Sequence, residues 1–356
     1  MSHIEKAQQI LLENNLDGLF ISSPLQIGYV TNFFGISPTE RESFVLVTKN
    51  ACYILTSPLY FEDAKKTSPD CIPVELSVDV SWVEAVEQIA NKEKLQRIGF
   101  EEYNLTVSEY KYLSSKQPNL TPVTIKNLRE IKDIAEIEAI KKACQIGDEA
   151  FTKILDIIKP GISEKDIAFQ LESIIRDNKS LPSFPTIVAF GPHAAVPHHR
   201  SSDTILEKNN FVLMDFGVQF ENYCSDMTRT IYVGHISDSE KKLYYTVKDA
   251  QQKAFEYVQS TNNPNAQQAD KIARDYIVSQ GYPQFPHSLG HGIGLEVHEA
   301  PSLSPYSKDV LKPGMVFSIE PGIYIPNNTG VRIEDLVAIS SSPTLLTLSS
   351  RDLIIL

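Results

Sequence analysis

The chain has 356 residues, of which 42% are hydrophobic, and its 33 Lys+Arg against 45 Asp+Glu give a net charge of −12. This length and composition exclude a disordered chain, a collagen-like repeat and a disulfide-stabilised miniprotein, and they allow two or three domains. The acidic balance also argues against nucleic acid or an anionic membrane as a partner, because bulk negative charge is repelled by both.

Cysteine usage and the N-terminal residues bear on the compartment. The four cysteines form no CxxC pair, which favours a reducing compartment in which the thiols pack as small core residues. The first fifteen residues contain no apolar stretch of the signal-peptide kind, and no apolar run is long enough to span a bilayer. We therefore expect a cytoplasmic protein that is not inserted in a membrane.

Up to about residue 128, the sequence alternates between helical and strand patterns. Apolar residues at helical spacing over 4–12 precede a short buried strand at 19–21. Two strand-like runs flank Lys49-Asn50 as in a hairpin, and a helix at 82–89 precedes a strand at 97–100. This alternation predicts a smaller α/β domain over residues 1–128.

From residue 129 the pattern changes to long helices mixed with antiparallel hairpins. A helical pattern opens at Leu128 and is stopped by Pro160-Gly161. Ser163-x-x-Asp166 and Ser237-x-x-Glu240 are capping boxes for the next helices, to about 175 and over 239–259, and another helix follows at 266–280. We predict an α+β domain over residues 129–356, where seven of the eight histidines lie.

The first notable hairpin is VLMDFGVQFENYCSDMTRT, with a polar turn near 220–222. Asp215 and Asp226 lie symmetrically about that turn, so the sequence predicts that they face each other across the two strands. Two like charges facing each other within apolar strands are destabilising, whereas a cation between them would reverse the sign of the interaction.

The second hairpin, MVFSIEPGIYIPNNTGVRIED, repeats this arrangement. Its turn is Pro326 to Gly330, and Glu320 and Glu334 are symmetric about it. A single acidic residue in a strand usually lies on a solvated face. Two symmetric pairs within apolar strands weaken that interpretation, although a register slip of one residue would turn a side chain to the other face.

Two histidine-rich segments supply nitrogen ligands. HSLGHGIGLEVHEAP contains His287, His291 and His298, and His291 lies between two glycines that allow close backbone approach. GPHAAVPHHR adds His193, His198 and His199, of which one or two would suffice for a site. Four carboxylates and one imidazole suit two divalent cations that activate a water and polarise a carbonyl, which is the chemistry of hydrolysis.

These motifs, in this order and spacing, resemble those of the pita-bread metallopeptidases, and specifically the Xaa-Pro dipeptidase (prolidase) and aminopeptidase P group. The matching segments are MDFG…YCSDMTRT, HSLGHGIGLEVHE, SIEPGIY and GVRIED, and LENNLDGLFISSPLQIGYVTNF is similar to the family's creatinase-type N-terminal domain. The resemblance therefore implies a pita-bread catalytic domain after a creatinase-type domain. It also implies an exopeptidase that cleaves between an N-terminal residue and proline.

The resemblance also implies a role for each motif residue. Asp215 would bind one metal ion, Asp226 and Glu334 both ions, and His291 and Glu320 the second ion. Glu320 would also help to deprotonate the attacking water, and His298 would contact the scissile carbonyl. The residues implied in substrate contact are His198, His287, His298 and Arg332, of which Arg332 would also hold the ligand network in place. Tyr324 and Thr228 would support the ligands from behind.

The resemblance leaves several points open. The metal is expected to be Mn²⁺, with Co²⁺ or Zn²⁺ as alternatives, and the family often forms homodimers. Some relatives are inactive binding or scaffold proteins or creatinase-like amidinohydrolases, but all five ligand positions here carry ligating residues, which favours the peptidase. Some dipeptidases of the family carry an arginine shortly after the position of His298. This chain has Ser302 there, which favours longer peptides, and the alternative is that another part of the chain or a partner subunit binds the carboxylate.

Overall fold

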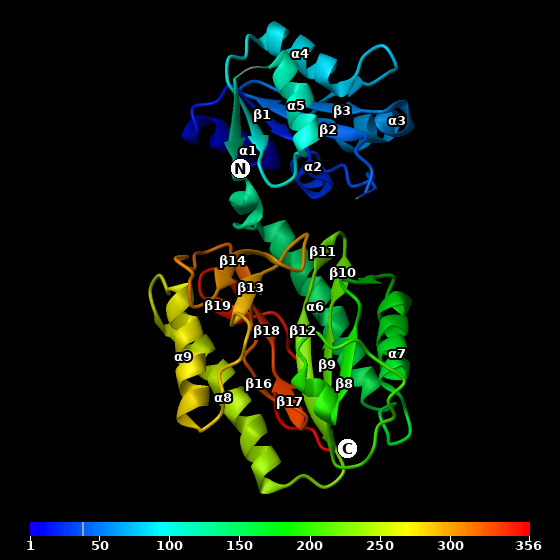
Figure 1. Ribbon diagram of the computed structural model, residues 1–356, viewed down its shortest axis with the longest axis vertical. Coiled ribbons are helices and arrows are strands. Elements are labelled where there is room, and N and C mark those ends of the chain that lie inside the picture. Colours follow the sequence, from blue (N-terminus) through cyan, green and yellow to red (C-terminus); the bar gives the residue numbers. More distant parts are fainter. Residues whose placement is uncertain (38, 118) are drawn as a thin grey trace. The chain divides into compact units, whose positions relative to one another are not determined.

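The computed structural model describes residues 1–37, 39–117 and 119–356, and these residues form two compact units, Met1–Leu128 and Arg129–Leu356. The smaller unit is built on a six-stranded mixed sheet in the order β4-β3-β2-β1-β5-β6 (Figure 1). Its elements are α1 (His3–Glu13), β1 (Gly18–Ile21), α2 (Pro24–Thr31), β2 (Ser43–Thr48), β3 (Cys52–Thr56), α3 (Pro58–Thr67), β4 (Ile72–Glu75), α4 (Trp82–Glu93), β5 (Ile98–Glu101), α5 (Val107–Lys116) and β6 (Leu120–Val123). The predicted hairpin at Lys49-Asn50 is confirmed, because β2 and β3 pair antiparallel on either side of it.

The larger unit combines long helices with antiparallel strands, which confirms the predicted α+β pattern. Its main sheets have the orders β12-β9-β8 and β14-β13-β15-β18-β19, and two smaller ones are β16-β17 and β11-β10-β7. Its elements are α6 (Ile134–Ile154), α7 (Glu164–Asp177), β7 (Leu181–Pro182), β8 (Ile187–Phe190), β9 (Asn210–Phe216), β10 (Val218–Phe220), β11 (Tyr223–Cys224), β12 (Met227–Val233), α8 (Asp238–Ser260), α9 (Ala266–Ser279), β13 (Gly290–Gly292), β14 (Glu299–Leu303), β15 (Val316–Ile319), β16 (Gly322–Ile325), β17 (Thr329–Arg332), β18 (Asp335–Ile339) and β19 (Pro343–Leu345), with 3₁₀ turns at Lys126–Arg129 and Gly191–Ala195.

The first long helix of the larger unit starts later and ends earlier than its apolar pattern predicts. Asp133 is the N-cap of α6, since its side chain accepts from the Glu136 N–H and the Glu136 carboxylate accepts from the Asp133 N–H. The predicted start at Leu128 is therefore wrong: the apolar spacing there continues through a 3₁₀ turn, and the capping box decides where the α-helix begins. The capping boxes at Ser163 and Ser237 are both confirmed.

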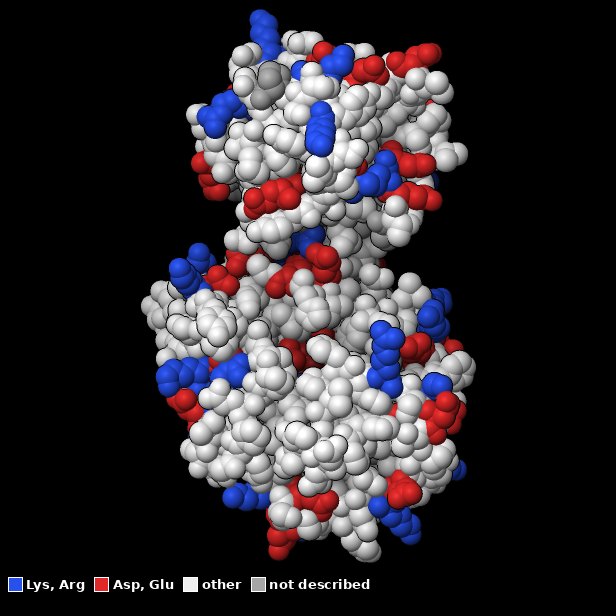
Figure 2. All heavy atoms as spheres, in the orientation of Figure 1, with Lys and Arg blue, Asp and Glu red and all other residues white. Residues whose placement is uncertain are grey.

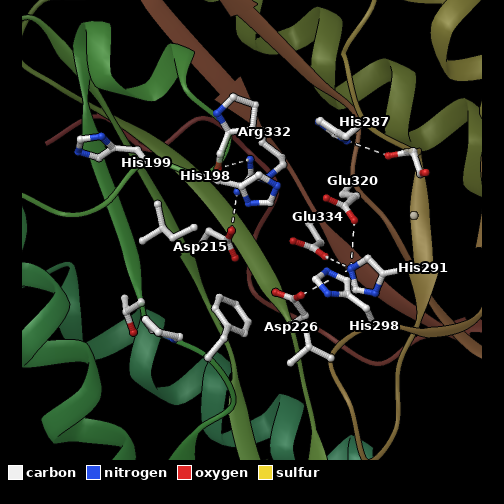
Figure 3. A pocket seen from close by; sticks show the side chains of 18 of the residues that line it. His198, His199, Asp215, Asp226, His287, His291, His298, Glu320, Arg332 and Glu334 are labelled. Atoms are coloured by element: carbon white, nitrogen blue, oxygen red, sulfur yellow. Dashed lines mark hydrogen bonds and ion pairs between the residues drawn. The ribbon is translucent and has the colours of Figure 1, made fainter. Parts of the chain in front are cut away.

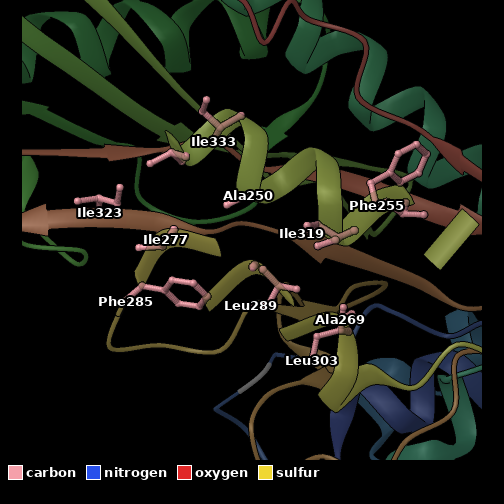
Figure 4. Close-up of a cluster of buried hydrophobic side chains, with 14 of the residues drawn as sticks. Ala250, Phe255, Ala269, Ile277, Phe285, Leu289, Leu303, Ile319, Ile323 and Ile333 are labelled. Carbon is pink, nitrogen blue, oxygen red and sulfur yellow. The ribbon is translucent and has the colours of Figure 1, made fainter. Parts of the chain in front are cut away.

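A large hydrophobic core lies between α8, α9 and the strands that carry the predicted ligands (Figure 4). Leu289, Ile319 and Ile333 are all buried in it. Ile319 and Ile333 directly precede Glu320 and Glu334, and Leu289 lies two residues before His291. Because Ile319 and Ile333 are anchored in this core, their chain neighbours Glu320 and Glu334 are turned away from it and line a cavity.

Two further observations concern the surface and the thiols. Lys and Arg side chains are interspersed with Asp and Glu on the face shown in Figure 2. None of the described helices is long and apolar enough to cross a membrane. All four cysteines are buried and free, as predicted for thiols that serve as core residues.

Candidate metal centre

The hairpin that carries Asp215 and Asp226 has a register different from the predicted one. Asp215 lies opposite Thr228 rather than opposite Asp226. The turn is formed by Glu221 and Asn222, both with positive φ (47° and 70°). Its centre lies one residue later in the chain than the midpoint between Asp215 and Asp226, on which the prediction is based. The partner of Asp215 therefore moves by two residues, which keeps Asp226 on the same face and makes it a diagonal neighbour.

The second hairpin has the predicted register. The pairs Ile319↔Asp335 and Gly322↔Arg332 on either side place Glu320 opposite Glu334. The two strands part at this point: the Glu320 N–H donates to Leu289 O at 2.8 Å, and the Glu334 N–H donates to Thr228 O at 3.1 Å. The opened hairpin thus joins the His291 segment on one side to β12 on the other, which brings both carboxylate pairs together.

The glycines around His291 allow that segment to approach its neighbours closely. A Cβ on Gly290 would lie 1.9 Å from Ser318 O, and a Cβ on Gly292 would lie 2.0 Å from Ala300 O. The His291 Nδ1 lies 3.1 Å from Gly292 O, a contact in which the ring must donate. This fixes Nδ1 as a donor and directs the Nε2 atom at the carboxylates.

Three of the predicted ligands surround the Nε2 atom of a fourth, His291 (Figure 3). It lies 3.2 Å from Glu320 Oε1, 3.7 Å from Asp226 Oδ2 and 3.9 Å from Glu334 Oε1. The ligand atoms of Asp226, His291 and Glu334 all lie within 4.8 Å of one another. Burial opposes protonation of His291, but the hydrogen bond to Glu320 and the nearby carboxylates raise its pKa to about 9.

Two buried carboxylate oxygens test whether this group fits a cation. Among the described residues, Asp226 Oδ1 and Glu334 Oε1 have no hydrogen-bond partner. Burial, reinforced by the neighbouring carboxylates, raises the pKa of both residues well above the usual range. A buried carboxylate oxygen without a hydrogen-bond partner is destabilising, and a site of carboxylate oxygens with one imidazole suits divalent cations as the missing partners. The residues therefore fit a pair of divalent metal ions.

Arg332 links the fifth ligand to the others. Its Nη2 donates to Asp215 Oδ2 at 2.6 Å and its Nε to Thr228 Oγ1 at 2.9 Å, while the Thr228 hydroxyl donates to Glu334 Oε2 at 2.7 Å. Its Nη1 lies 3.0 Å from the hydroxyl of Tyr324. One guanidinium thus orients two of the carboxylates, as expected for residues that support ligands from behind.

We predict that Arg332→Lys lowers kcat/KM about 10- to 100-fold. A lysine keeps the charge, but a single ammonium group cannot bond Asp215, Thr228 and Tyr324 in the planar geometry of a guanidinium. The measurement is steady-state kinetics together with metal titration by calorimetry. Wild-type activity and wild-type metal affinity in this variant would contradict the role given to Arg332.

The three histidines expected to contact substrate line the same cavity as the carboxylates. The cavity has a volume of about 860 Å³ and includes His198, His287 and His298. The His298 ring meets the His291 ring edge-on at 4.4 Å, and burial lowers the pKa of His298. Burial also lowers the pKa of His287, whose Nε2 lies 2.8 Å from the Tyr324 hydroxyl. Apolar side chains complete the wall: Phe184, Pro185, Ile187, Pro197 and Val297.

The other two histidines of the GPHAAVPHHR segment serve a different purpose. His193 and His199 both bond the buried carboxylate of Glu164, at 2.8 Å each. Figure 3 shows His199 apart from the ligand group, whereas His198 lies beside Arg332. Glu164 could not be identified from the sequence, because its only sequence feature is a position in the first turn of a capped helix, where acidic residues are common.

A two-domain chain whose α+β unit encloses four carboxylates and a directed imidazole belongs to the class of metal-dependent hydrolases. Comparison with known families agrees with this class and makes it specific. The chain belongs to metallopeptidase family M24, whose model matches residues 138–341, and residues 3–131 match the Creatinase/Prolidase N-terminal domain. The pita-bread catalytic domain and the creatinase-type N-terminal domain are thereby confirmed.

Relatives and solved structures match over nearly the whole chain. The Xaa-Pro dipeptidase of Pyrococcus furiosus is 37% identical over 354 residues, which is 99% of both chains. The uncharacterized peptidase YqhT of Bacillus subtilis is 36% identical over 360 residues, again 99% of both. The structure of an Xaa-Pro dipeptidase from Bacillus anthracis has a TM-score of 0.92 at 37% identity, covering 99% of each chain. An X-Pro aminopeptidase from Thermotoga maritima has a TM-score of 0.86 at 31% identity, covering 98% of this chain and 100% of that one.

Proposed function

We propose that the protein is a metal-dependent exopeptidase that hydrolyses the bond between an N-terminal residue and proline. The observation that carries the proposal is the group of three carboxylates around His291, in which one oxygen of Asp226 and one of Glu334 are buried without a hydrogen-bond partner among the described residues. An inactive binding protein on this fold would have no need to keep this costly arrangement, and neither would a metal-free amidinohydrolase. The relatives named as Xaa-Pro peptidases support the choice of substrate.

In this proposal Asp215 would hold one ion, His291 and Glu320 would hold the other, and Asp226 and Glu334 would contribute to both. Two divalent ions bound there supply Lewis-acid polarisation of the scissile carbonyl and lower the pKa of a bound water. The Ser318 hydroxyl donates to Glu320 Oε1 at 3.0 Å, so Oε2 remains available to take the proton of the attacking water.

The histidines orient the peptide and meet the charge that develops on it. In this proposal His298, whose ring meets that of His291 at the cavity wall, contacts the scissile carbonyl, where a ring N–H stabilises the oxyanion. His198 and His287 lie on the cavity wall and bind the substrate. The apolar wall beside His198 suits the proline ring, which has no N–H to satisfy.

The metal, compartment and assembly are the finer parts of the proposal. One imidazole with carboxylate oxygens is a hard ligand set, which favours Mn²⁺ over softer ions. Four reduced, buried thiols suit the cytoplasm. We also propose that the protein acts as a homodimer, as the family often does, and that its partners do not include nucleic acid or membrane.

The preferred substrate length depends on whether a cationic side chain in the cavity can bind the C-terminal carboxylate of a dipeptide. Ser302 lines the cavity, as the sequence led us to expect, but so does Arg200, an exposed guanidinium that sequence reasoning overlooked. Because Arg332 is committed to Asp215, Arg200 is the guanidinium available to the C-terminal carboxylate of a dipeptide. This favours Xaa-Pro dipeptides and removes the argument for longer peptides from Ser302.

The test is hydrolysis of Xaa-Pro dipeptides and Xaa-Pro-Xaa tripeptides by the full chain, with Mn²⁺ and after removal of metal by a chelator. We expect metal-dependent release of the N-terminal residue, and elemental analysis should find two ions per chain. Bound metal without cleavage of either peptide set would indicate a different hydrolase. No metal and no cleavage would favour a binding protein.

A further inference from the structure

A buried carboxylate outside the metal centre organises one wall of the active-site cavity. Glu164 is the first residue of α7, and its side chain is fully buried. Its Oε1 accepts from the Phe190 N–H at 2.9 Å and from His193 Nδ1 at 2.8 Å. Its Oε2 accepts from His199 Nε2 at 2.8 Å, from the Ser202 N–H at 2.9 Å and from the Ser202 hydroxyl at 2.6 Å.

These five contacts all fall within residues 190–202, which we call the His198 segment. Phe190 and Ser202 are its two ends, and His199 directly follows His198. The segment is also held from the opposite side: Pro197 O lies 3.5 Å from Arg332 Nη1, and a Cβ on Gly330 would lie 1.9 Å from Ala194 O. His198 is therefore carried by a chain segment that is fixed from two directions.

The contacts also exclude a second cation site at this cluster. Both oxygens of Glu164 already accept several hydrogen bonds, in contrast to the unpartnered oxygens of Asp226 and Glu334. Moreover, each Glu164 oxygen accepts from a backbone N–H, a donor that cannot be reversed. Only an ionised carboxylate satisfies both ends of the segment, because an amide would turn its NH₂ group toward one of these donors.

We propose that Glu164 is a positioning residue for substrate binding, which holds His198 in the cavity by fixing both ends of the segment and the ring of His199. This inference rests on the proposed function, in which His198 contacts the peptide. Glu164 itself touches neither substrate nor metal ligands. Its effect is therefore expected in KM, while the affinity for metal remains unchanged.

The first test is a double-mutant cycle between Glu164→Gln and His198→Ala, measured on an Xaa-Pro substrate with Mn²⁺. Each single change should raise KM about tenfold, because a small misplacement of a binding group is enough to weaken substrate binding. In the His198→Ala background, Glu164→Gln should change KM less than about twofold, since the group it positions is already absent. Additive effects of the two changes would overturn the proposal.

A matched control separates positioning from general loss of stability. Asp148 fixes another segment in the same way, accepting from the Leu348 N–H at 2.9 Å, the Ser349 N–H at 2.7 Å and the Ser349 hydroxyl at 2.5 Å, but it does not line the cavity. Asp148→Asn should leave KM unchanged in both backgrounds. A rise in KM equal to that of Glu164→Gln would overturn the proposal.

The second test does not depend on activity. Hydrogen–deuterium exchange measured by mass spectrometry should be about tenfold faster in peptides from residues 190–202 of Glu164→Gln, and unchanged in α8 and α9. His199→Phe removes a single contact and serves if Glu164→Gln does not fold. Unchanged exchange in residues 190–202 in the variant that folds would overturn the proposal. If the wild-type protein cleaves no Xaa-Pro peptide, the proposed function fails, and exchange alone decides whether Glu164 fixes the segment.

Discussion

Replacing Asp226 by Asn is expected to lower kcat/KM by at least about 1,000-fold, which corresponds to about 4 kcal/mol of transition-state stabilisation. Asp226 is buried within 4.8 Å of both His291 and Glu334, and its Oδ1 is one of the oxygens without a partner. An amide of the same shape keeps one neutral oxygen and loses the negative charge, so a ligand shared by two cations is weakened for both. The measurement is steady-state hydrolysis at saturating Mn²⁺.

Metal content must be followed in the same variant, because the loss of activity should come with loss of at least one bound ion per chain. The control is Asp275→Asn, which removes an exposed aspartate on α9 that pairs with Lys271. That change should leave both metal content and activity at the wild-type level. Near-normal activity of Asp226→Asn would show that this residue does not bridge the ions.

The two carboxylate hairpins show what could be predicted from the sequence and what could not. The turn from Pro326 to Gly330 is rich in turn-forming residues, so the symmetry of Glu320 and Glu334 about it identified the true register. The first hairpin turns at Glu221 and Asn222 instead, and Glu is uncommon at positive φ. Its register was therefore wrong by two residues, an error that leaves every side chain on its predicted face.

Contacts made across long sequence separations could not be predicted. Glu164 precedes Ser202 by 38 residues, and its buried contacts with two histidines leave no periodic or compositional signal. In the same way, the Glu320 N–H bonds to Leu289 and the Glu334 N–H bonds to Thr228. These contacts depend on the point at which the two strands of the second hairpin separate. The ligand residues could be identified because each hairpin pairs residues close in sequence, whereas the scaffold around them is formed by tertiary contacts.

Metal removal is expected to lower the stability of the folded protein, and Glu334→Gln should restore part of the stability of the metal-free form. Mn²⁺ at about 100 times its dissociation constant stabilises the native state by about 2.7 kcal/mol per site, or roughly 5–10 °C in Tm for a unit of this size. Without cations, buried carboxylates face one another, and Glu334 Oε1 has no partner among the described residues. Calorimetry with and without a chelator measures the difference.

Glu334→Gln should act in opposite directions on the two forms. Its amide oxygen can replace Oε2, which accepts from the Thr228 hydroxyl at 2.7 Å, while its NH₂ group takes the place of Oε1 beside Asp226. The new NH₂ group can donate to the Asp226 carboxylate, whereas the wild-type Oε1 repels it. The metal-free variant should therefore melt at or above the metal-free wild type. With Mn²⁺ the order should invert, because the variant has lost a charged ligand. Equal destabilisation of both forms would show that the carboxylates around His291 are not held together by cations.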